Sequence, residues 1–274
     1  MPLTTLLGVD VGGSGVKAAC VELRTGSAQG RHRVPTPVPA TPEAIARTVG
    51  EVVGHFEDSS GPIGCTMPAV VTDGVVRTAA NIDATWIGTD ARALFTEATG
   101  RACSVLNDAD AAGVAEVRLG AARGVPGVVA MVTLGTGVGT AVFVDGVLVP
   151  NMELGHIEVD GKVADQWANA ATRETHDLSW KDWSKRVDKY LKHLHALIWC
   201  DLIVMGGGVV KHSDRFTDRL DPDCEVRVAQ LGNNAGIVGA ALVAADTSLA
   251  PAEQEWLQRP TGSGSPKRPV NTEV

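Results

Sequence analysis

Apolar residues along the chain fall into short unbroken runs and into runs with helical spacing. The segment LLGVDVGGSGVKAACVEL, residues 6–23, places two apolar runs on either side of a glycine turn, which predicts strand, turn, strand. VVAMVTLGTGVGTAVFVDGVLV, residues 128–149, repeats that order, and its Asp145–Gly146 turn leads to a further strand. The two glycine hairpins lie about 120 residues apart and suggest duplicated halves around a cleft.

Helical spacing is clearest in two segments. Residues 42–55 begin with proline after Thr41, a residue suited to cap a helix N-terminus. Residues 178–199 carry apolar side chains three or four apart, and Ser179 with Asp182 resembles a capping box. Further helices are predicted at residues 89–99 and 109–119 and after Asn233 or Asn234, and strands at 63–67, 69–71, 104–106 and 201–205. Alternating strands and helices predict an α/β fold.

Composition limits the function. The chain has 274 residues, 44% of them hydrophobic, enough for a sizeable core and about two domains. Its net charge of −8 argues against nucleic acid as a partner. No run approaches the roughly 18 apolar residues of a membrane span, and the N-terminus lacks the features of a signal peptide. The five cysteines form no CxxC, which predicts reduced, buried thiols in a cytoplasmic protein.

The order of elements predicts two lobes and a tail. Residues 1–108 would form a small N-terminal lobe, joined by the helix near 234–246, and residues 109–233 a larger C-terminal lobe. Residues 257–274 are rich in proline, glycine and serine, which predicts a disordered tail.

Glycine clusters at three strand ends suggest phosphate binding, because glycine lets backbone N–H groups approach a ligand closely. The first cluster lacks the spacing of a P-loop or a dinucleotide fingerprint. Asp10 could hold magnesium through water, and a plain tight hairpin with a solvent-facing carboxylate is the alternative. The predicted donor-binding residues are Asp10, Gly12, Gly13, Ser14, Gly15, Lys17, Thr133, Gly135, Thr136, Gly137, Gly206, Gly207 and Gly208.

Asp108 is the candidate general base. It stands between a predicted strand and a predicted helix, where phosphoryl transfer would need a carboxylate to accept a hydroxyl proton. Its alternative function is helix N-capping, which aspartate often performs. Asp110 is a less well placed competitor, because it lies inside the helix.

Glu153 and His156 offer paired acceptors and donors for the hydroxyls of a sugar, with a metal site as the alternative. Asn81 and Asp83 are further hydroxyl-binding candidates. Trp86 could pack on a sugar face or lie in the core.

Together these motifs resemble the ROK family of sugar kinases, within the actin-like ATPase superfamily. DVGGSG at 10–15, NDA at 107–109, LGTGVG at 134–139, ELGH at 153–156 and GGGV at 206–209 stand in the family's order. The resemblance implies a ribonuclease H-like fold with two duplicated lobes around a cleft. It also implies that Asp108 is catalytic and that Glu153 and His156 bind the sugar.

One departure concerns metal. Most family members follow this histidine with a CxCGxxGCxE zinc motif, but here no cysteine occurs between His156 and Cys200. We therefore expect no zinc at that position. The glutamate of that motif is also missing as a sugar ligand, and Glu158 is its expected substitute.

DVGGSGVK, VVRTAANIDATWIGTD and LSWKDWSKRVDKYL further resemble the polyphosphate-using glucokinase subgroup, whose members take inorganic polyphosphate and in many cases ATP as donor. A polyphosphate chain needs a cationic track, and one helix face offers a candidate, with an ordinary solvated face as the alternative. That stripe is Lys181, Lys185, Lys189 and Lys192.

The sequence thus predicts a magnesium-dependent kinase that phosphorylates the 6-hydroxyl of glucose from polyphosphate, and from ATP as a second donor. The predicted glucose ligands are Asn81, Asn107, Asp108, Glu153, His156 and Glu158. The resemblance implies a homodimer. The alternatives are an ATP-only glucokinase or mannokinase and a non-catalytic sugar sensor of the same family.

Overall fold

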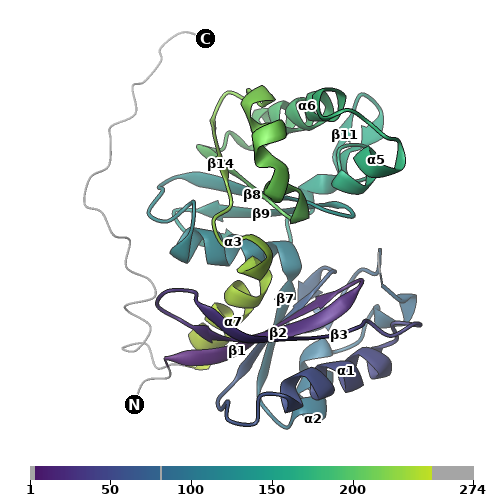
Figure 1. The fold of residues 1–274 in the computed structure, drawn as a ribbon, viewed down its shortest axis with the longest axis vertical. Helices are drawn as coiled ribbons and strands as arrows, with labels where there is room; N and C mark the ends of the chain where they lie inside the picture. The colour runs from purple at the N-terminus through teal and green to yellow at the C-terminus, as the bar shows by residue number, and fades with distance from the viewer. Residues whose placement is uncertain (1–3, 81, 249–274) are drawn as a thin grey trace.

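The computed structural model describes residues 4–80 and 82–248. Asn81 and the tail predicted at 257–274 lie outside the described residues. Two five-stranded sheets share one topology (Figure 1). The N-terminal sheet has the order β3-β2-β1-β4-β7 and the C-terminal sheet the order β10-β9-β8-β13-β14. In each sheet the first three strands are antiparallel and the last three are parallel.

The strand bounds locate both hairpins within these sheets. The N-terminal sheet comprises β1 (Thr5–Gly12), β2 (Gly15–Glu22), β3 (Ala28–Val34), β4 (Ile63–Met67) and β7 (Cys103–Asn107). The C-terminal sheet comprises β8 (Val128–Leu134), β9 (Val138–Val144), β10 (Val147–Val149), β13 (Leu202–Gly206) and β14 (Glu225–Val228). Two small ribbons are β5 (Val71–Thr72) with β6 (Val75–Val76), and β11 (Glu158–Val159) with β12 (Lys162–Val163).

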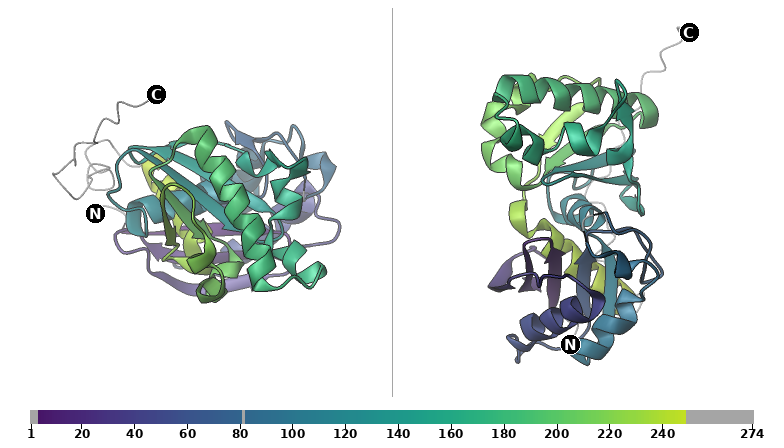
Figure 2. Two further views of the ribbon diagram at one scale, coloured as in Figure 1. Left: turned by 90° about the horizontal axis from the view of Figure 1, so that it is seen from above. Right: turned by 90° about the vertical axis from the view of Figure 1, so that its right-hand side faces the viewer.

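Two helices, α3 (Asp108–Leu119) and α7 (Ala235–Ser248), pack against each other between the sheets (Figures 1 and 2). Small residues allow this close packing. A Cβ atom at Gly239 on α7 would lie 1.7 Å from the Ala111 carbonyl oxygen on α3, and one at Gly64 on β4 would lie 1.8 Å from the Ala240 carbonyl oxygen on α7. Helix α7 also packs on β1 and β4 of the N-terminal sheet. The lobe boundary at residue 108 stays a prediction.

Other helices cover the outer faces. In the N-terminal lobe α1 (Pro42–Gly54) and α2 (Ala91–Thr99) close a core that includes Trp86. In the C-terminal lobe α6 (Trp180–Ile198) packs with α4 (Ala164–Trp167) and α5 (Ala170–Thr175) over a separate core. Short 3₁₀ helices occur at Ala84–Trp86, Leu154–His156, Gly208–Arg215, Thr217–Arg219 and Gly232–Asn234. Among the described residues, no helix is both long and apolar enough to cross a membrane.

The N-caps expected at Thr41 and Ser179 are confirmed. Thr41 Oγ1 accepts a hydrogen bond from the Ala44 N–H at the start of α1, and Ser179 Oγ accepts one from the Asp182 N–H at the start of α6. The strand predicted at residues 69–71 is wrong, because β5 begins only at Val71. Pro68 lacks an N–H for a sheet ladder, and the Ala69 carbonyl instead accepts from Asn107 Nδ2.

Candidate active site between two glycine hairpins

The first hairpin presents a tight, exposed turn. Gly12 pairs with Gly15 in the β1–β2 register, which leaves Gly13 and Ser14 exposed at the tip. Two side chains from the β3 region hold this turn: the Arg33 guanidinium donates to the Ser14 carbonyl, and the Thr36 hydroxyl donates to the Gly12 carbonyl. Sequence reasoning missed both residues, because it did not predict β3.

Directly below this turn lies a half-buried ion pair. Asp10 is opposite Lys17 in the register, and Lys17 Nζ lies 3.3 Å from Asp10 Oδ2. The other carboxylate oxygen, Oδ1, accepts a hydrogen bond of 2.9 Å from Thr66 Oγ1 on β4. Asp10 is therefore held in place by two neighbouring strands, and the first hairpin carries both a cation and an anion.

The second hairpin is anchored from outside the sheet. Asp165 Oδ1 on α4 accepts from the Val138 N–H at 2.7 Å, and Asn169 Nδ2 donates to the Thr136 carbonyl at 2.7 Å. A Cβ atom at Gly137 would lie 2.3 Å from Asp165 Oδ1, so this carboxylate occupies the space that glycine leaves free. Sequence reasoning missed Asp165 and Asn169, whose contacts are long-range.

The third glycine cluster adjoins the second. Gly206 is paired with Thr133 in the β13–β8 register. Gly207 has a φ of 84°, and a Cβ atom there would lie 2.4 Å from the Leu134 carbonyl oxygen. The second hairpin also meets the start of α3, since a Cβ atom at Gly139 would lie 3.0 Å from Ala109 Cβ. These contacts place the third glycine cluster against the second hairpin, and the second hairpin against the residue that follows Asp108.

Asp108 is not the cap of α3. Asn107 has that function, because its Oδ1 accepts from the N–H groups of Ala109 at 2.8 Å and Asp110 at 3.1 Å. The Asp108 carboxylate accepts from the Ala109 N–H at 2.9 Å and from its own N–H, and it is not needed to cap the helix. Desolvation, with the nearby negative charges of Asp10 and Glu153, raises the pKa of Asp108 to about 7. Such a pKa suits a general base working near neutral pH.

Asp110, the competitor, is 2% exposed and has a structural partner. Its Oδ2 accepts a hydrogen bond of 2.9 Å from the Asn151 N–H, which ties α3 to the segment before Glu153. Oδ1 is buried without a partner among the described residues. Desolvation is the main cause that raises the pKa of Asp110 to about 6.

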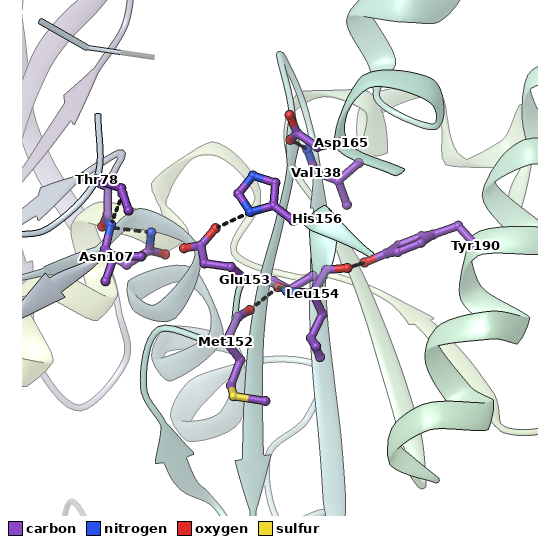
Figure 3. Close-up of polar contacts among 12 residues, drawn as sticks. Thr78, Asn107, Val138, Met152, Glu153, Leu154, His156, Asp165 and Tyr190 are labelled. Atoms are coloured by element: carbon purple, nitrogen blue, oxygen red, sulfur yellow. Dashed lines mark hydrogen bonds and ion pairs between the residues drawn. The ribbon is translucent and has the colours of Figure 1, made fainter. Parts of the chain in front are cut away.

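Glu153 and His156 lie together on a turn. Glu153 Oε2 is 3.8 Å from His156 Nδ1, and Figure 3 places the Glu153 carboxylate between His156 and Asn107. The turn is fixed from below, where the Thr140 hydroxyl accepts from the Leu154 N–H at 2.9 Å and the Tyr190 hydroxyl donates to the Leu154 carbonyl at 3.4 Å. Desolvation raises the pKa of Glu153, while His156 acts to lower it.

Three other candidates lie apart from this group. Trp86 is fully buried and its Nε1 donates to the Ala40 carbonyl at 2.9 Å, so it is a core residue. Asp83 accepts from the Thr85 N–H at 2.9 Å and caps the 3₁₀ helix that follows. Glu158 is exposed on β11, and no hydrogen bond joins it to Glu153 or His156 within the part of the chain that is described.

The lysine stripe lies on α6, which covers the C-terminal sheet on the side away from α3 and α7 (Figures 1 and 2). Three of the four lysines form ion pairs: Lys185 with Asp182 at 2.8 Å, Lys192 with Asp188 at 2.9 Å, and Lys189 with Asp160. Lys181 is exposed. These carboxylates lower the net positive charge of the stripe.

The fold and the grouped motifs define a sugar kinase of the actin-like ATPase class, and comparisons with known proteins specify the family. Residues 6–174 match the ROK family. The polyphosphate glucokinase of Mycobacterium tuberculosis is 48% identical over 244 residues, 88% of this chain and 92% of the relative. The polyphosphate glucokinase of Mycobacterium leprae is 45% identical over 86% of this chain and 73% of the relative. The chain belongs to the ROK family.

Solved structures agree. The crystal structure of an inorganic polyphosphate/ATP-glucomannokinase from Arthrobacter sp. strain KM is 45% identical and superposes with a TM-score of 0.86, over 89% of this chain and 99% of that chain. A ROK family glucokinase from Streptomyces griseus, in complex with glucose and AMPPNP, is 24% identical with a TM-score of 0.76, over 87% of this chain and 98% of that chain. This second likeness supports the fold alone.

Proposed function

We propose that this protein phosphorylates the 6-hydroxyl of glucose with inorganic polyphosphate as donor, and with ATP as a second donor, to give glucose 6-phosphate. The observation that carries the proposal is the state of the Asp108 carboxylate. Asn107 and not Asp108 caps helix α3, and the pKa of Asp108, raised to about 7, suits a general base. The polyphosphate glucokinases and the polyphosphate/ATP-glucomannokinase among its relatives support this choice of substrates.

Asp108 would accept the proton of the 6-hydroxyl as that oxygen attacks the terminal phosphorus of the donor. The P–O bond to the rest of the donor breaks, and the shortened polyphosphate leaves with the electron pair. Because Asp108 is ionised only above its raised pKa, the enzyme needs near-neutral pH for this step.

Glucose would be held beside Asp108 by Asn107, Glu153 and His156. Asn107 has little spare capacity, since Oδ1 caps α3 and Nδ2 donates to the Ala69 carbonyl at 3.2 Å. One N–H of that amide remains for a sugar hydroxyl. Glu153 and His156 are exposed enough to reach a ligand, with 40% and 56% of their side chains accessible. Glu158 and Asn81 remain predicted ligands.

The donor phosphates would lie against the N–H groups of the two hairpins and the Gly206–Gly208 segment, with Lys17 and Ser14 near the transferred group. Magnesium is the proposed metal. The Asp10 carboxylate is close enough to Asp108 to raise its pKa, so the two negative charges repel each other. A divalent cation bound between the donor and Asp10 would offset that repulsion. When bound, magnesium would neutralise charge on the phosphates.

The decisive experiment measures glucose 6-phosphate formed by purified protein with magnesium at low salt, with polyphosphate and ATP supplied separately. We expect product from both donors and a higher kcat/KM with polyphosphate. Product from ATP alone would favour the ATP-only glucokinase or mannokinase. Glucose binding by calorimetry without product from either donor would favour the sugar-sensing alternative.

A homodimer in the cytoplasm is also proposed. The edge strand β10 supports the dimer, because it exposes 70% of Val147 and 36% of Val149 on a surface that a second copy could cover. Light scattering after size-exclusion chromatography should give twice the chain mass of 28.5 kDa, and a monomeric mass would remove this part of the proposal.

A further inference from the structure

Far from the hairpins, three side chains that can bind a metal ion meet near the end of α6. Cys200 Sγ lies 3.7 Å from His195 Nδ1 and 3.9 Å from Cys224 Sγ. All three ligand atoms lie within 4.8 Å of one another, and no other such group of three occurs among the described residues. His195 is in the last turn of α6, Cys200 precedes β13, and Cys224 directly precedes β14.

These spacings match the edges of a metal tetrahedron. With metal–sulfur bonds of about 2.3 Å and metal–nitrogen bonds of about 2.0 Å, tetrahedral angles place two sulfurs about 3.8 Å apart and sulfur and nitrogen about 3.5 Å apart. The observed 3.9 Å and 3.7 Å agree with both values. A disulfide would instead bring the two sulfur atoms to about 2.05 Å. The Cys200 and Cys224 sulfurs are therefore not bonded, and their separation suits two ligands of one metal ion.

The backbone is bent in a way that makes the group possible. Trp199 ends α6 with a φ of 50°, a left-handed conformation that costs energy for a bulky residue, and its side chain is 75% exposed. This turn reverses the chain after α6 and returns Cys200 to the His195 side chain. Trp199 is the C-cap of α6: its N–H donates to the His195 carbonyl at 2.7 Å, and its ring lies 5.8 Å from the His195 ring.

The surroundings are negative. Asp201 directly follows Cys200 in the sequence, and Asp223 directly precedes Cys224. Acidic neighbours favour a divalent cation at this group. Two thiolates with one neutral imidazole and one divalent ion give zero net charge, which suits a site where Cys200 is only 2% exposed.

We propose that His195 Nδ1, Cys200 Sγ and Cys224 Sγ bind a zinc ion, with water as the fourth ligand. Binding releases one proton from each thiol to the solvent. The ion would take no part in phosphoryl transfer, because Cys200 is at the opposite end of β13 from Gly206, roughly 15–20 Å from the donor loops at about 3.3 Å per residue. It would tie α6, β13 and β14 together, and it occupies a different place from the motif that family members carry after their sugar-binding histidine.

The test titrates the reduced, chelator-treated full chain with Co²⁺, followed by Zn²⁺. We expect a thiolate-to-cobalt charge-transfer band and tetrahedral ligand-field bands that saturate at one equivalent and vanish when Zn²⁺ is added. Cys200→Ser and Cys224→Ser should abolish the bands, and His195→Gln should weaken binding at least tenfold. Cys20→Ser, which alters a half-buried thiol on β2, is the matched control and should retain them.

Two further readouts address folding and rival chemistry. Zn²⁺ should raise the unfolding temperature of the parent and of Cys20→Ser but not of Cys200→Ser, while glucose phosphorylation stays unchanged in every variant with a parental circular dichroism spectrum. Bands that persist in Cys200→Ser, or no bands in the parent, would overturn the proposal. If mass spectrometry finds a Cys200–Cys224 disulfide in protein that binds no Co²⁺, the proposed metal site is wrong, and the two cysteines form a redox-active pair instead.

Discussion

The two glycine hairpins occupy equivalent places in two sheets of the same topology, yet they are built differently. The first is stabilised by charges within its own strands, where Asp10 and Lys17 face each other. The second has no ionisable residue between Leu134 and Gly139 and is held from outside by Asp165 and Asn169. The two sheets thus carry equivalent backbone turns, and only the first hairpin has charged groups within its own strands, at Asp10 and Lys17.

The proposed catalytic base belongs to neither hairpin. Asp108 begins the helix that runs between the sheets, where both lobes contribute to its environment: Asp10 from the first and Glu153 from the second. Both hairpins lie near the Asp108 carboxylate: Asp10 of the first raises its pKa, and Gly139 of the second adjoins Ala109.

Asp108→Asn should have the largest effect. It removes the proton acceptor and keeps the side chain's shape, so kcat should fall by about 10²- to 10⁴-fold while glucose still binds. Steady-state kinetics with polyphosphate and calorimetric titration with glucose give the two readings. Turnover at the parental rate would show that another group takes the proton.

The same variant reveals the cost of burying the carboxylate. The pKa of Asp108 is raised from 3.8 to about 7, so between those values the folded protein binds more protons than the unfolded chain, and stability falls as pH rises. Asp108→Asn should remove this slope and melt at a higher temperature than the parent at pH 8 but not at pH 4. A parallel pair of melting profiles would contradict the raised pKa.

The pH–rate profile of the parent should show the next largest effect. Because only ionised Asp108 can accept a proton, kcat/KM should fall about tenfold per pH unit below about pH 7 and level off above it. Rates with saturating glucose and magnesium, measured with each donor, provide the test. An inflection near pH 4 for both donors would mean that the carboxylate is not desolvated in the working enzyme.

Alanine in the two turns compares the cradles directly. A Cβ atom at Gly137 would displace Asp165, and the Val138 N–H would lose its partner, whereas a Cβ atom at Gly13 meets nothing within 4 Å. Gly137→Ala should cost about 1–3 kcal/mol of stability and lower kcat/KM about tenfold or more. Gly13→Ala is the matched control with a small effect. Equal losses would show that ligand contact at the tips outweighs anchoring of the turns.

Local signals predicted much of this architecture. The caps of α1 and α6 and the glycine hairpins depend on neighbouring residues, so the sequence alone indicated them. Strand β3 was missed because AQGRHRV is a polar edge strand with little apolar alternation. The anchoring of the second hairpin by Asp165 depends on a contact across 27 residues, which no local pattern reveals.

Long-range contacts also decide two other features, the cysteine pair and the role of Asp108, which local sequence patterns could not resolve. The absence of a CxxC motif does not show that Cys200 and Cys224 are apart, because the pairing of β13 with β14 brings residues 24 positions apart together. The choice between base and cap for Asp108 needed coordinates, since Asn107 and Asp108 are both good capping residues. Only the hydrogen bonds to Asn107 Oδ1 assign the cap.

The smallest effect is expected at the α6 stripe. Its ion pairs are exposed, with 66% and 58% of the Lys185 and Asp182 side chains accessible, whereas the Lys17–Asp10 pair is 23% and 20% accessible. Exposed pairs contribute at most about 1 kcal/mol, so changing Lys185, Lys189 and Lys192 together to glutamine should lower kcat/KM for polyphosphate only about fivefold. The loss should shrink as salt rises, because screening weakens long-range attraction.

Lys17→Met is the contrasting variant, because Lys17 lies beside the loop that both donors would use. It should lower kcat/KM with polyphosphate and with ATP alike, while the triple glutamine variant should leave the ATP reaction unchanged. Measuring both donors at low and high salt separates the two cases. If the triple variant loses nothing with polyphosphate at low salt, the stripe is an ordinary solvated helix face, and the long donor must run along another surface of the C-terminal lobe.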